Sequence, residues 1–276
     1  MADKTDAMLK VLERDIKKVY SKAYTEIRGQ VDKVQGMLSS VEAGTPRERY
    51  LLLKKDRLKA IEKQMVDIEA EANTVARQMI DEKMLDIYKY NYNQSAEQLG
   101  FSVIDNSAVR KILTKEQNPF VMVKDLTNKA DVTAKLQGEF MTSLLQGESI
   151  QKMARRLKNA SEGYLKRSIL TARTETTRVQ NSAKMDIGAE GEELGYIMEK
   201  VWIATKDSRT RDAHIDMDGV AVPQDEPFIV KNADGSTVEM MFPGDVNGGA
   251  EQVCNCRCTM VERIKRDEDG NLIMKK

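Results

Sequence analysis

The only histidine and all three cysteines of this 276-residue chain lie in two short stretches near its C-terminus. The first stretch spans residues 207–214 and ends at His214, and the second contains Cys254, Cys256 and Cys258. Imidazole and thiolate groups bind zinc, and they also serve as nucleophile and base in enzymes. The specific chemistry of this chain is therefore expected in these two stretches.

The spacing of the cysteines indicates a metal site. Alternate residues of an extended segment point to one face, so the three thiols are predicted to point together. With His214 they would form a tetrahedral Cys₃His zinc site, or a carboxylate such as Asp207 or Asp245 would complete the shell. Buried or free thiols are the alternative interpretation, because C-x-C-x-C differs from the usual C-x₂-C spacing of zinc knuckles.

A catalytic thiol is a separate hypothesis. It needs a lowered pKa, which Arg257 or His214 would provide. A nucleophile–base pair also needs an orienting group and a pocket, and the sequence identifies neither. We therefore expect no enzymatic activity, and a metal-dependent, nuclease-like enzyme acting on nucleic acid is the alternative.

Charged, aromatic and turn-forming residues flank the metal candidates. They are Trp202, Asp207, Arg209, Arg211, Asp218, Gly219, Asp245, Asn255 and Arg257. The single tryptophan is expected to anchor a small core. The charges of residues 207–211 are predicted to make bidentate pairs that orient the loop, or else to form a solvated turn. The Asp-Gly and Pro-Gly-Asp sequences at 218–219 and 243–245 are typical of turns at strand ends.

Long helices precede this region. Apolar residues at three- and four-residue steps predict an amphipathic helix over 5–40, and a turn at 43–48 begins a second helix. The second helix carries an alternating three-four seam that indicates a coiled coil, made of Leu58, Ile61, Met65, Ile68, Ala72, Val75 and Met79. The two helices are predicted to form an antiparallel hairpin, either as a projecting arm or as part of a bundle completed by later helices.

Further along the chain, another helix is predicted over 161–189, and its basic side chains would face a partner or water. Segments rich in strand-forming residues follow at 196–203, 228–230, 237–242 and 258–264. The predicted class is α+β, with a long helical hairpin and bundle before a small β-containing module. The expected divisions are 1–100 (coiled-coil-like arm), 101–190 (helical part), 191–265 (small module) and 266–276 (charged tail).

Composition limits the classes of function. Lys plus Arg equals Asp plus Glu at 44 each, so no net field attracts nucleic acid or a membrane surface. No apolar run of about 18 residues predicts a membrane span, and the N-terminus lacks the apolar core of a signal peptide. The odd number of cysteines argues against a disulfide framework and suits a reducing cytosol.

The ordered motifs resemble those of the phage head morphogenesis family, the Mu-F-like minor capsid proteins. The resemblance begins with Ala-Arg-Thr-Glu at 172–175, which contains Arg173 and Glu175. It continues through Trp202, the Asp-x-Arg-Thr-Arg-x-x-His turn of 207–214, and the Asp-Gly of 218–219. It ends with the Pro-Gly-Asp of 243–245 and the Asn-Cys-Arg-Cys of 255–258. Cys254 is an addition to this last motif.

The resemblance covers about residues 130–265 and implies a structural protein of a tailed phage or prophage. It implies association with the portal and with capsid or scaffold proteins during head assembly, and a role in DNA packaging or ejection. The protein would then lie in the virion head after assembly in the host cytoplasm. Self-association through the N-terminal helices and contact with DNA are further expectations.

Overall fold

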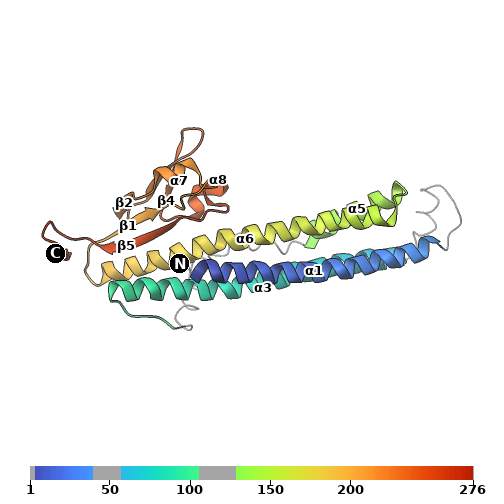
Figure 1. Ribbon diagram of the computed structural model, residues 1–276, viewed down its shortest axis with the longest axis horizontal. Helices are drawn as coiled ribbons and strands as arrows, with labels where there is room; N and C mark the ends of the chain where they lie inside the picture. Colours follow the sequence, from blue (N-terminus) through green and yellow to red (C-terminus); the bar gives the residue numbers. More distant parts are fainter. Residues whose placement is uncertain (1–3, 40–56, 106–128, 276) are drawn as a thin grey trace. The chain divides into compact units, whose positions relative to one another are not determined.

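A computed structural model describes residues 4–39, 57–105 and 129–275. Four long helices come first: α1 (Lys4–Ser39), α3 (Arg57–Leu99), α5 (Lys129–Leu145) and α6 (Ile150–Glu193). Short strands and helices follow them (Figure 1). The predicted α+β class, helical first and β-containing last, is confirmed. The predicted turn at 43–48 lies outside the described residues.

The C-terminal elements are small and antiparallel. They are β1 (Met198–Ile203), α7 (Asp212–Asp216), β2 (Ala221–Pro223), β3 (Phe228–Lys231), β4 (Thr237–Met240), η2 (Val246–Gly248), α8 (Gly249–Val253) and β5 (Thr259–Ile264). One sheet has the order β2-β1-β5, and β3 pairs with β4 in a second sheet. The four predicted strands are present, and the three-residue β2 was not anticipated because so short a strand carries no alternation to detect.

The described residues belong to two compact units. The helical unit contains residues 12–39, 57–80 and 129–169, and the mixed unit contains residues 4–11, 81–105 and 170–275. Helices α1, α3 and α6 contribute to both units. Among the described helices, none combines the length and the apolar character that crossing a membrane would require.

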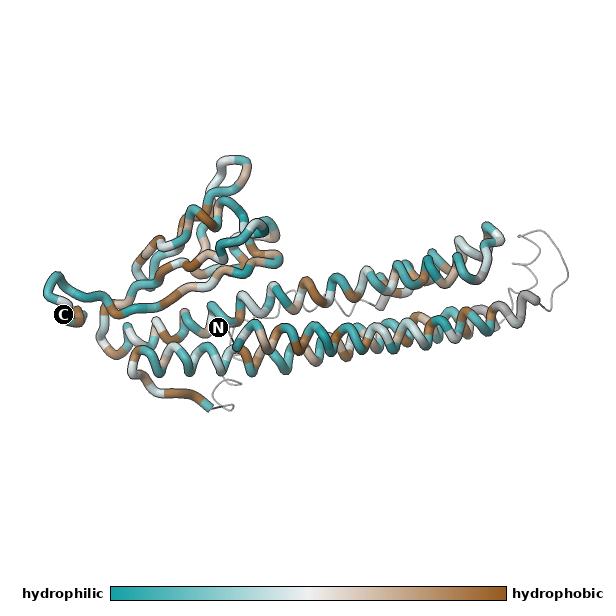
Figure 2. Tube along the Cα trace, viewed as in Figure 1, coloured by the Kyte–Doolittle hydropathy of each residue, from teal (hydrophilic) through white to brown (hydrophobic). Residues whose placement is uncertain are grey.

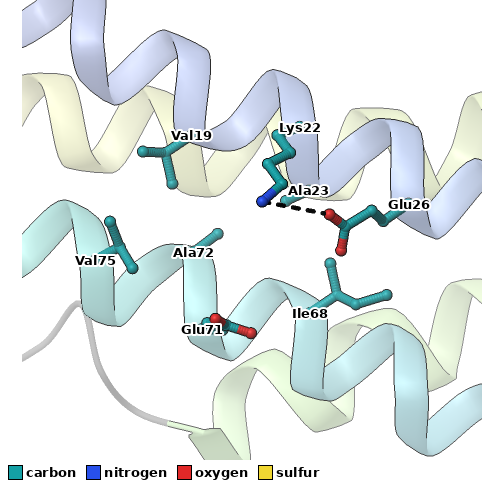
Figure 3. Close-up of a pocket in the computed structure, with 8 residues that line it drawn as sticks. All are labelled: Val19, Lys22, Ala23, Glu26, Ile68, Glu71, Ala72 and Val75. Carbon is teal, nitrogen blue, oxygen red and sulfur yellow. Dashed lines mark ion pairs between the residues drawn. The ribbon is translucent and has the colours of Figure 1, made fainter.

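In the helical unit, α6 completes a bundle with α1 and α3. The Tyr20 hydroxyl of α1 lies 2.5 Å from Asn73 Oδ1 on α3 and 2.7 Å from Ser168 Oγ on α6. Ser161 of α6 donates to Glu69 of α3 at 2.8 Å. Figure 3 shows α1 and α3 side by side. The hairpin therefore does not stand alone here, and of the two arrangements considered the bundle is found.

The predicted heptad seam of α3 is only partly correct. Ile68, Val75 and Met79 are half-buried, whereas Glu69 and Asn73 are fully buried. One row of buried side chains advances mostly in steps of four: Ile61, Met65, Glu69, Ala72, Ala76, Ile80, Met84, Ile87, Asn91 and Ser95. Other buried side chains lie beside this row: Val66, Asn73, Tyr88, Tyr92 and Ala96. This period exceeds the 3.5 residues of a heptad. The reason is that α3 packs against two helices, which buries a wider face than a two-stranded seam does. The Leu58 side chain lies outside the described part.

A cleft of about 190 Å³ opens between α1 and α3 of the helical unit (Figure 3). Its lining is mainly aliphatic, with an ion pair between Lys22 and Glu26 at 3.9 Å on one rim. Ile68 and Val75 point into it, which explains why these two residues of the predicted seam stay half-buried. Figure 2 shows apolar and polar residues alternating along both helices, as expected of amphipathic helices.

In the mixed unit, one stretch of α6 is buried almost all round. Residues 171–179 are all buried except Arg173, which is half-buried. Helix α3 covers one side of α6, where the hydroxyls of Tyr88 and Tyr92 donate to Asp186 and Glu190. The segment that leads into β5 covers another side. The basic side chains of this helix were predicted to face a partner or water, but Arg178 is 5% exposed and pairs with Glu175.

Candidate metal centre

The structure brings His214, Cys256 and Cys258 together. The His214 Nδ1 atom lies 3.5 Å from the Cys256 Sγ and 3.5 Å from the Cys258 Sγ. One ligand atom from each of the three residues lies within 4.8 Å of the others. All three side chains are buried, with 1–2% exposed. The group can therefore hold a metal ion.

Cys254 does not join this group, which corrects the expectation that all three thiols share one face. The cysteine segment is not extended, because Cys254 caps the C-terminus of α8 and Asn255 has a φ of 58°. This left-handed residue turns the chain between Cys254 and Cys256, and an Asn tolerates that conformation better than most residues do. The thiol of Cys254 is free and partly exposed.

Short elements position the three candidate ligands. His214 lies in α7, and both cysteines lie between α8 and β5. They pack in a core with Trp202, whose ring meets the His214 ring edge-on at 5.3 Å between centroids. Trp202 also contacts Phe228 edge-on at 5.2 Å. The predicted role of this tryptophan as the core anchor is confirmed by its complete burial.

The pKa values of the Cys256 and Cys258 thiols are shifted in opposite directions. A hydrogen bond from Cys256 lowers the pKa of the Cys258 thiol. The same bond to Cys258, together with burial, raises the pKa of Cys256. One thiolate beside one imidazole nitrogen is a donor set that suits a soft divalent ion such as zinc.

Salt bridges stabilise the charged turn that begins at Asp207 and leads to His214. Arg257 makes two bonds of 2.5 Å to the carboxylate of Asp207, and Arg209 lies 3.4 Å from the same carboxylate. The bond with Arg257 lowers the pKa of Asp207. Arg211 donates to the Cys254 carbonyl at 2.7 Å. Of the two interpretations considered for this charged turn, bidentate pairing is the one found.

The predicted turn residues hold turns at nearby strand ends and do not bind a metal. Asp218 accepts from the Ala204 amide at 2.9 Å, and Gly219 has a φ of 81°. Asp245 accepts from the amides of Met241 and Asn247 at 2.7 and 3.0 Å. Neither Asp207 nor Asp245 belongs to the metal-capable group found among the described residues.

Two side chains of α6 hold the cysteine segment, and sequence reasoning missed both. Asn181 accepts from the Met260 amide at 3.0 Å and donates to the carbonyls of Pro243 and Cys258 at 2.8 and 3.2 Å. The Thr177 hydroxyl donates to the Cys256 carbonyl. Both residues lie within one helical turn or two of the Ala-Arg-Thr-Glu motif at 172–175. The available signal was their position, one to two helical turns after that motif.

The region that carries this site is similar to a known protein family. Residues 134–261, which include α6 and all three candidate ligands, match the sequence model of the family described as Phage Mu protein F like protein. Through this region the chain is similar to that family, as the ordered motifs predict.

Individual relatives share different lengths of the chain. Minor head protein GP7 of Bacillus phage SPP1 is 28% identical over 269 residues, which cover 93% of this chain and 83% of GP7. The NAD(+)–arginine ADP-ribosyltransferase EFV of Enterococcus faecalis is 31% identical over 134 residues, 49% of this chain and only 26% of that protein. Protein YqbB of Bacillus subtilis is 27% identical over 146 residues, 50% of this chain and 46% of YqbB. No solved structure gives a significant match.

Proposed function

We propose that this chain is a minor head protein of a tailed phage or prophage, with a structural role in head assembly. The observation that carries the proposal is the similarity to GP7 over 93% of the chain. That alignment takes in the long helices as well as the mixed unit. The shorter match to the transferase covers about half of this chain and does not by itself favour a function.

The partners proposed are the portal protein and capsid or scaffold proteins, with DNA contact during packaging or ejection. Helix α6 already covers the faces of α1 and α3 at Tyr20, Glu69 and Asn73. A partner, or a second copy of the chain, would therefore bind the outer faces of the helices rather than the seam. The protein would lie in the virion head after assembly in the host cytoplasm.

A structural role suits the burial of the candidate metal centre. His214, Cys256 and Cys258 are 1–2% exposed beneath Trp202 and its neighbours. A phosphodiester is too large to reach ligand atoms at that depth without opening the core. This burial favours the structural proposal over the alternative, a metal-dependent enzyme acting on nucleic acid at the packaging vertex.

Co-expression with the portal protein of the same phage genome tests the assembly role. We expect the two proteins to co-purify, and we expect deletion of the gene to reduce the yield of infectious particles. Normal particle yield without the gene, together with no binding to the portal, would overturn the proposal. Nicking of plasmid DNA by purified protein with Mg²⁺, Mn²⁺ or Zn²⁺, lost in His214→Ala, would instead favour the enzyme.

The mixed unit is further proposed to hold a zinc ion on His214, Cys256 and Cys258. With Zn–S near 2.3 Å and Zn–N near 2.0–2.1 Å, tetrahedral geometry separates nitrogen from sulfur by about 3.5 Å. Both Nδ1–Sγ distances are 3.5 Å. A water would complete the shell, because the group found among the described residues has three members.

Metal analysis of the purified protein tests zinc occupancy. We expect about one zinc per chain, lost in Cys256→Ser and retained in Cys254→Ser, because Cys254 lies outside the group. Wild-type protein without metal, and with a melting temperature that a chelator leaves unchanged, would contradict the proposal.

A further inference from the structure

A line of hydrogen-bonded side chains leads from the surface to the far side of the His214 ring. The Ser236 hydroxyl donates to Asp234 Oδ1 at 2.6 Å, and Asn232 Nδ2 donates to Ser236 Oγ at 2.9 Å. Gln252 Nε2 donates to Asn232 Oδ1 at 2.7 Å. The side-chain oxygen of Gln252, Oε1, lies 3.0 Å from His214 Nε2. The line thus connects the β3–β4 turn, through α8, to the imidazole in α7.

The direction of donation along this line is set at its outer end. A carboxylate can only accept, and the bonds from Ser236 lower the pKa of Asp234, so this group is ionised at neutral pH. The Ser236 hydroxyl donates its only proton to the Asp234 carboxylate, so its oxygen must accept from the amide nitrogen of Asn232. The Asn232 oxygen then accepts from Gln252, which leaves only an oxygen to face the ring.

The end of the line therefore requires a proton on one particular ring nitrogen. Because Gln252 presents an acceptor, His214 Nε2 must donate, and a neutral imidazole carries only one proton. The other nitrogen, Nδ1, then has a free lone pair. That lone pair faces the two sulfur atoms at equal distances of 3.5 Å.

We propose that Gln252, Asn232, Ser236 and Asp234 are positioning residues that hold His214 as a metal ligand through Nδ1, for a thiophilic divalent cation of the zinc type. A lone pair equidistant from two sulfurs is suited to a cation shared by all three atoms, whereas an S–H···N bond would use one sulfur. Hydrogen bonding of the second ring nitrogen is the usual way that proteins orient a metal-binding histidine. The inference rests on the zinc occupancy proposed above.

The tautomer can be measured without ambiguity, because His214 is the only histidine of the chain. The experiment uses the full-length protein labelled with ¹⁵N in its imidazole ring and long-range proton–nitrogen correlation at neutral pH, before and after addition of Zn²⁺. We expect Nε2 to carry the proton in both states and Nδ1 alone to shift markedly with zinc. A proton on Nδ1, or a zinc-induced shift of Nε2 in place of Nδ1, would overturn the proposal.

The variant Gln252→Leu tests the positioning role, with Gln224→Leu as the matched control. Both glutamines are buried in the mixed unit, with 2% and 3% exposed, but Gln224 bonds to Met185 and lies away from the ligands. In competition with a chromogenic chelator, Gln252→Leu should bind zinc about 10- to 100-fold more weakly. Gln224→Leu should bind it as the wild type does. Equal zinc affinity of the wild type and Gln252→Leu would count against the role.

The two readouts separate this inference from zinc occupancy itself. If wild-type protein takes up no zinc while Nε2 still carries the proton, the occupancy proposal fails and His214 is not a metal ligand, although the line of side chains still fixes its tautomer. If zinc binds while Nδ1 carries the proton in the metal-free protein, the positioning inference fails and occupancy stands. The wild-type measurement does not depend on whether the Gln252 variant folds.

Discussion

Glu262 is a carboxylate buried on the inner side of β5, with 7% of its surface exposed. It accepts from the Ser95 hydroxyl of α3 at 3.3 Å, and its second oxygen has no partner. Burial raises its pKa to about 7, and the positive charge of Lys184 only partly offsets this effect. Ionisation of Glu262 therefore destabilises the folded protein, and the free energy of unfolding depends on pH.

The sign of this dependence follows from proton binding. Between the ordinary value of 4.5 and about 7, folded Glu262 binds more protons than the unfolded chain, so its contribution to stability falls as pH rises through this range. We expect Glu262→Gln to remove this fall and to gain up to about 3 kcal/mol relative to wild type between pH 4.5 and pH 8. Urea unfolding of both proteins at the two pH values measures the difference.

The control for this prediction is Glu268→Gln, because Glu268 is exposed. Its unfolding free energy relative to wild type should not change with pH. A Glu262→Gln variant that differs from wild type by the same amount at both pH values would show that burial does not raise the pKa of Glu262.

At the scale of elements, one side chain of α6 joins the helix to the C-terminal strands. Asn181 uses both its oxygen and its nitrogen, contacting the backbone at Pro243, Cys258 and Met260. An Asn181→Ala change would leave two carbonyls and one amide without these partners. Each such buried group costs about 1–3 kcal/mol.

We therefore expect Asn181→Ala to destabilise the mixed unit by about 2–4 kcal/mol. It should also speed hydrogen exchange at the Met260 amide. Gln180→Ala is the comparison, because Gln180 makes a single 3.3 Å bond to Thr259 and should cost less than about 1 kcal/mol. Similar losses for the two variants would contradict the role assigned to Asn181.

The register of α3 gives a second prediction at this scale. Ala76 is completely buried, whereas Val75 is half-buried and lines the cleft with α1. Ala76→Leu should overpack the bundle and cost about 1–3 kcal/mol, while Val75→Leu has space and should cost little. Thermal or denaturant unfolding distinguishes them. The reverse order of costs would restore the heptad seam predicted from sequence.

At the scale of the whole molecule, the region that matches the family model lacks some of its packing partners. Residues 134–261 include α6, but Tyr88 and Tyr92, which bond to Asp186 and Glu190 of α6, lie in α3 outside that region. Burial raises the pKa of Asp186, so removing α3 changes both packing and charge on this face. The long helices thus belong to the fold of the C-terminal part.

A fragment of residues 129–276 should therefore lack a cooperative thermal transition. Addition of a fragment of residues 1–105, which supplies α1 and α3, should restore it. Calorimetry of the two fragments, separately and mixed, checks this expectation. A fragment 129–276 that melts as sharply as the full chain would mean that α6 and the strands are stable without the N-terminal helices.

The sequence by itself predicted the α+β class, most of the long helices, four of the five described strands and the resemblance to the family. Period and strand-forming residues act locally, so strands β1, β3, β4 and β5 could be predicted before their partners were known. The clustering of His214 with Cys256 and Cys258 was also readable, because these residue types are rare in this chain.

Only the tertiary structure decided which side chains meet. The left-handed Asn255 excluded Cys254 from the metal-capable group, and no alternation rule anticipates a single reversal of φ. Because α3 packs against two helices, its buried face includes Glu69 and Asn73, and a pattern of apolar residues cannot predict the burial of polar ones. Gln252 and Asn181 act through partners 20 to 79 residues away, and contacts at such separations depend on how the elements pack.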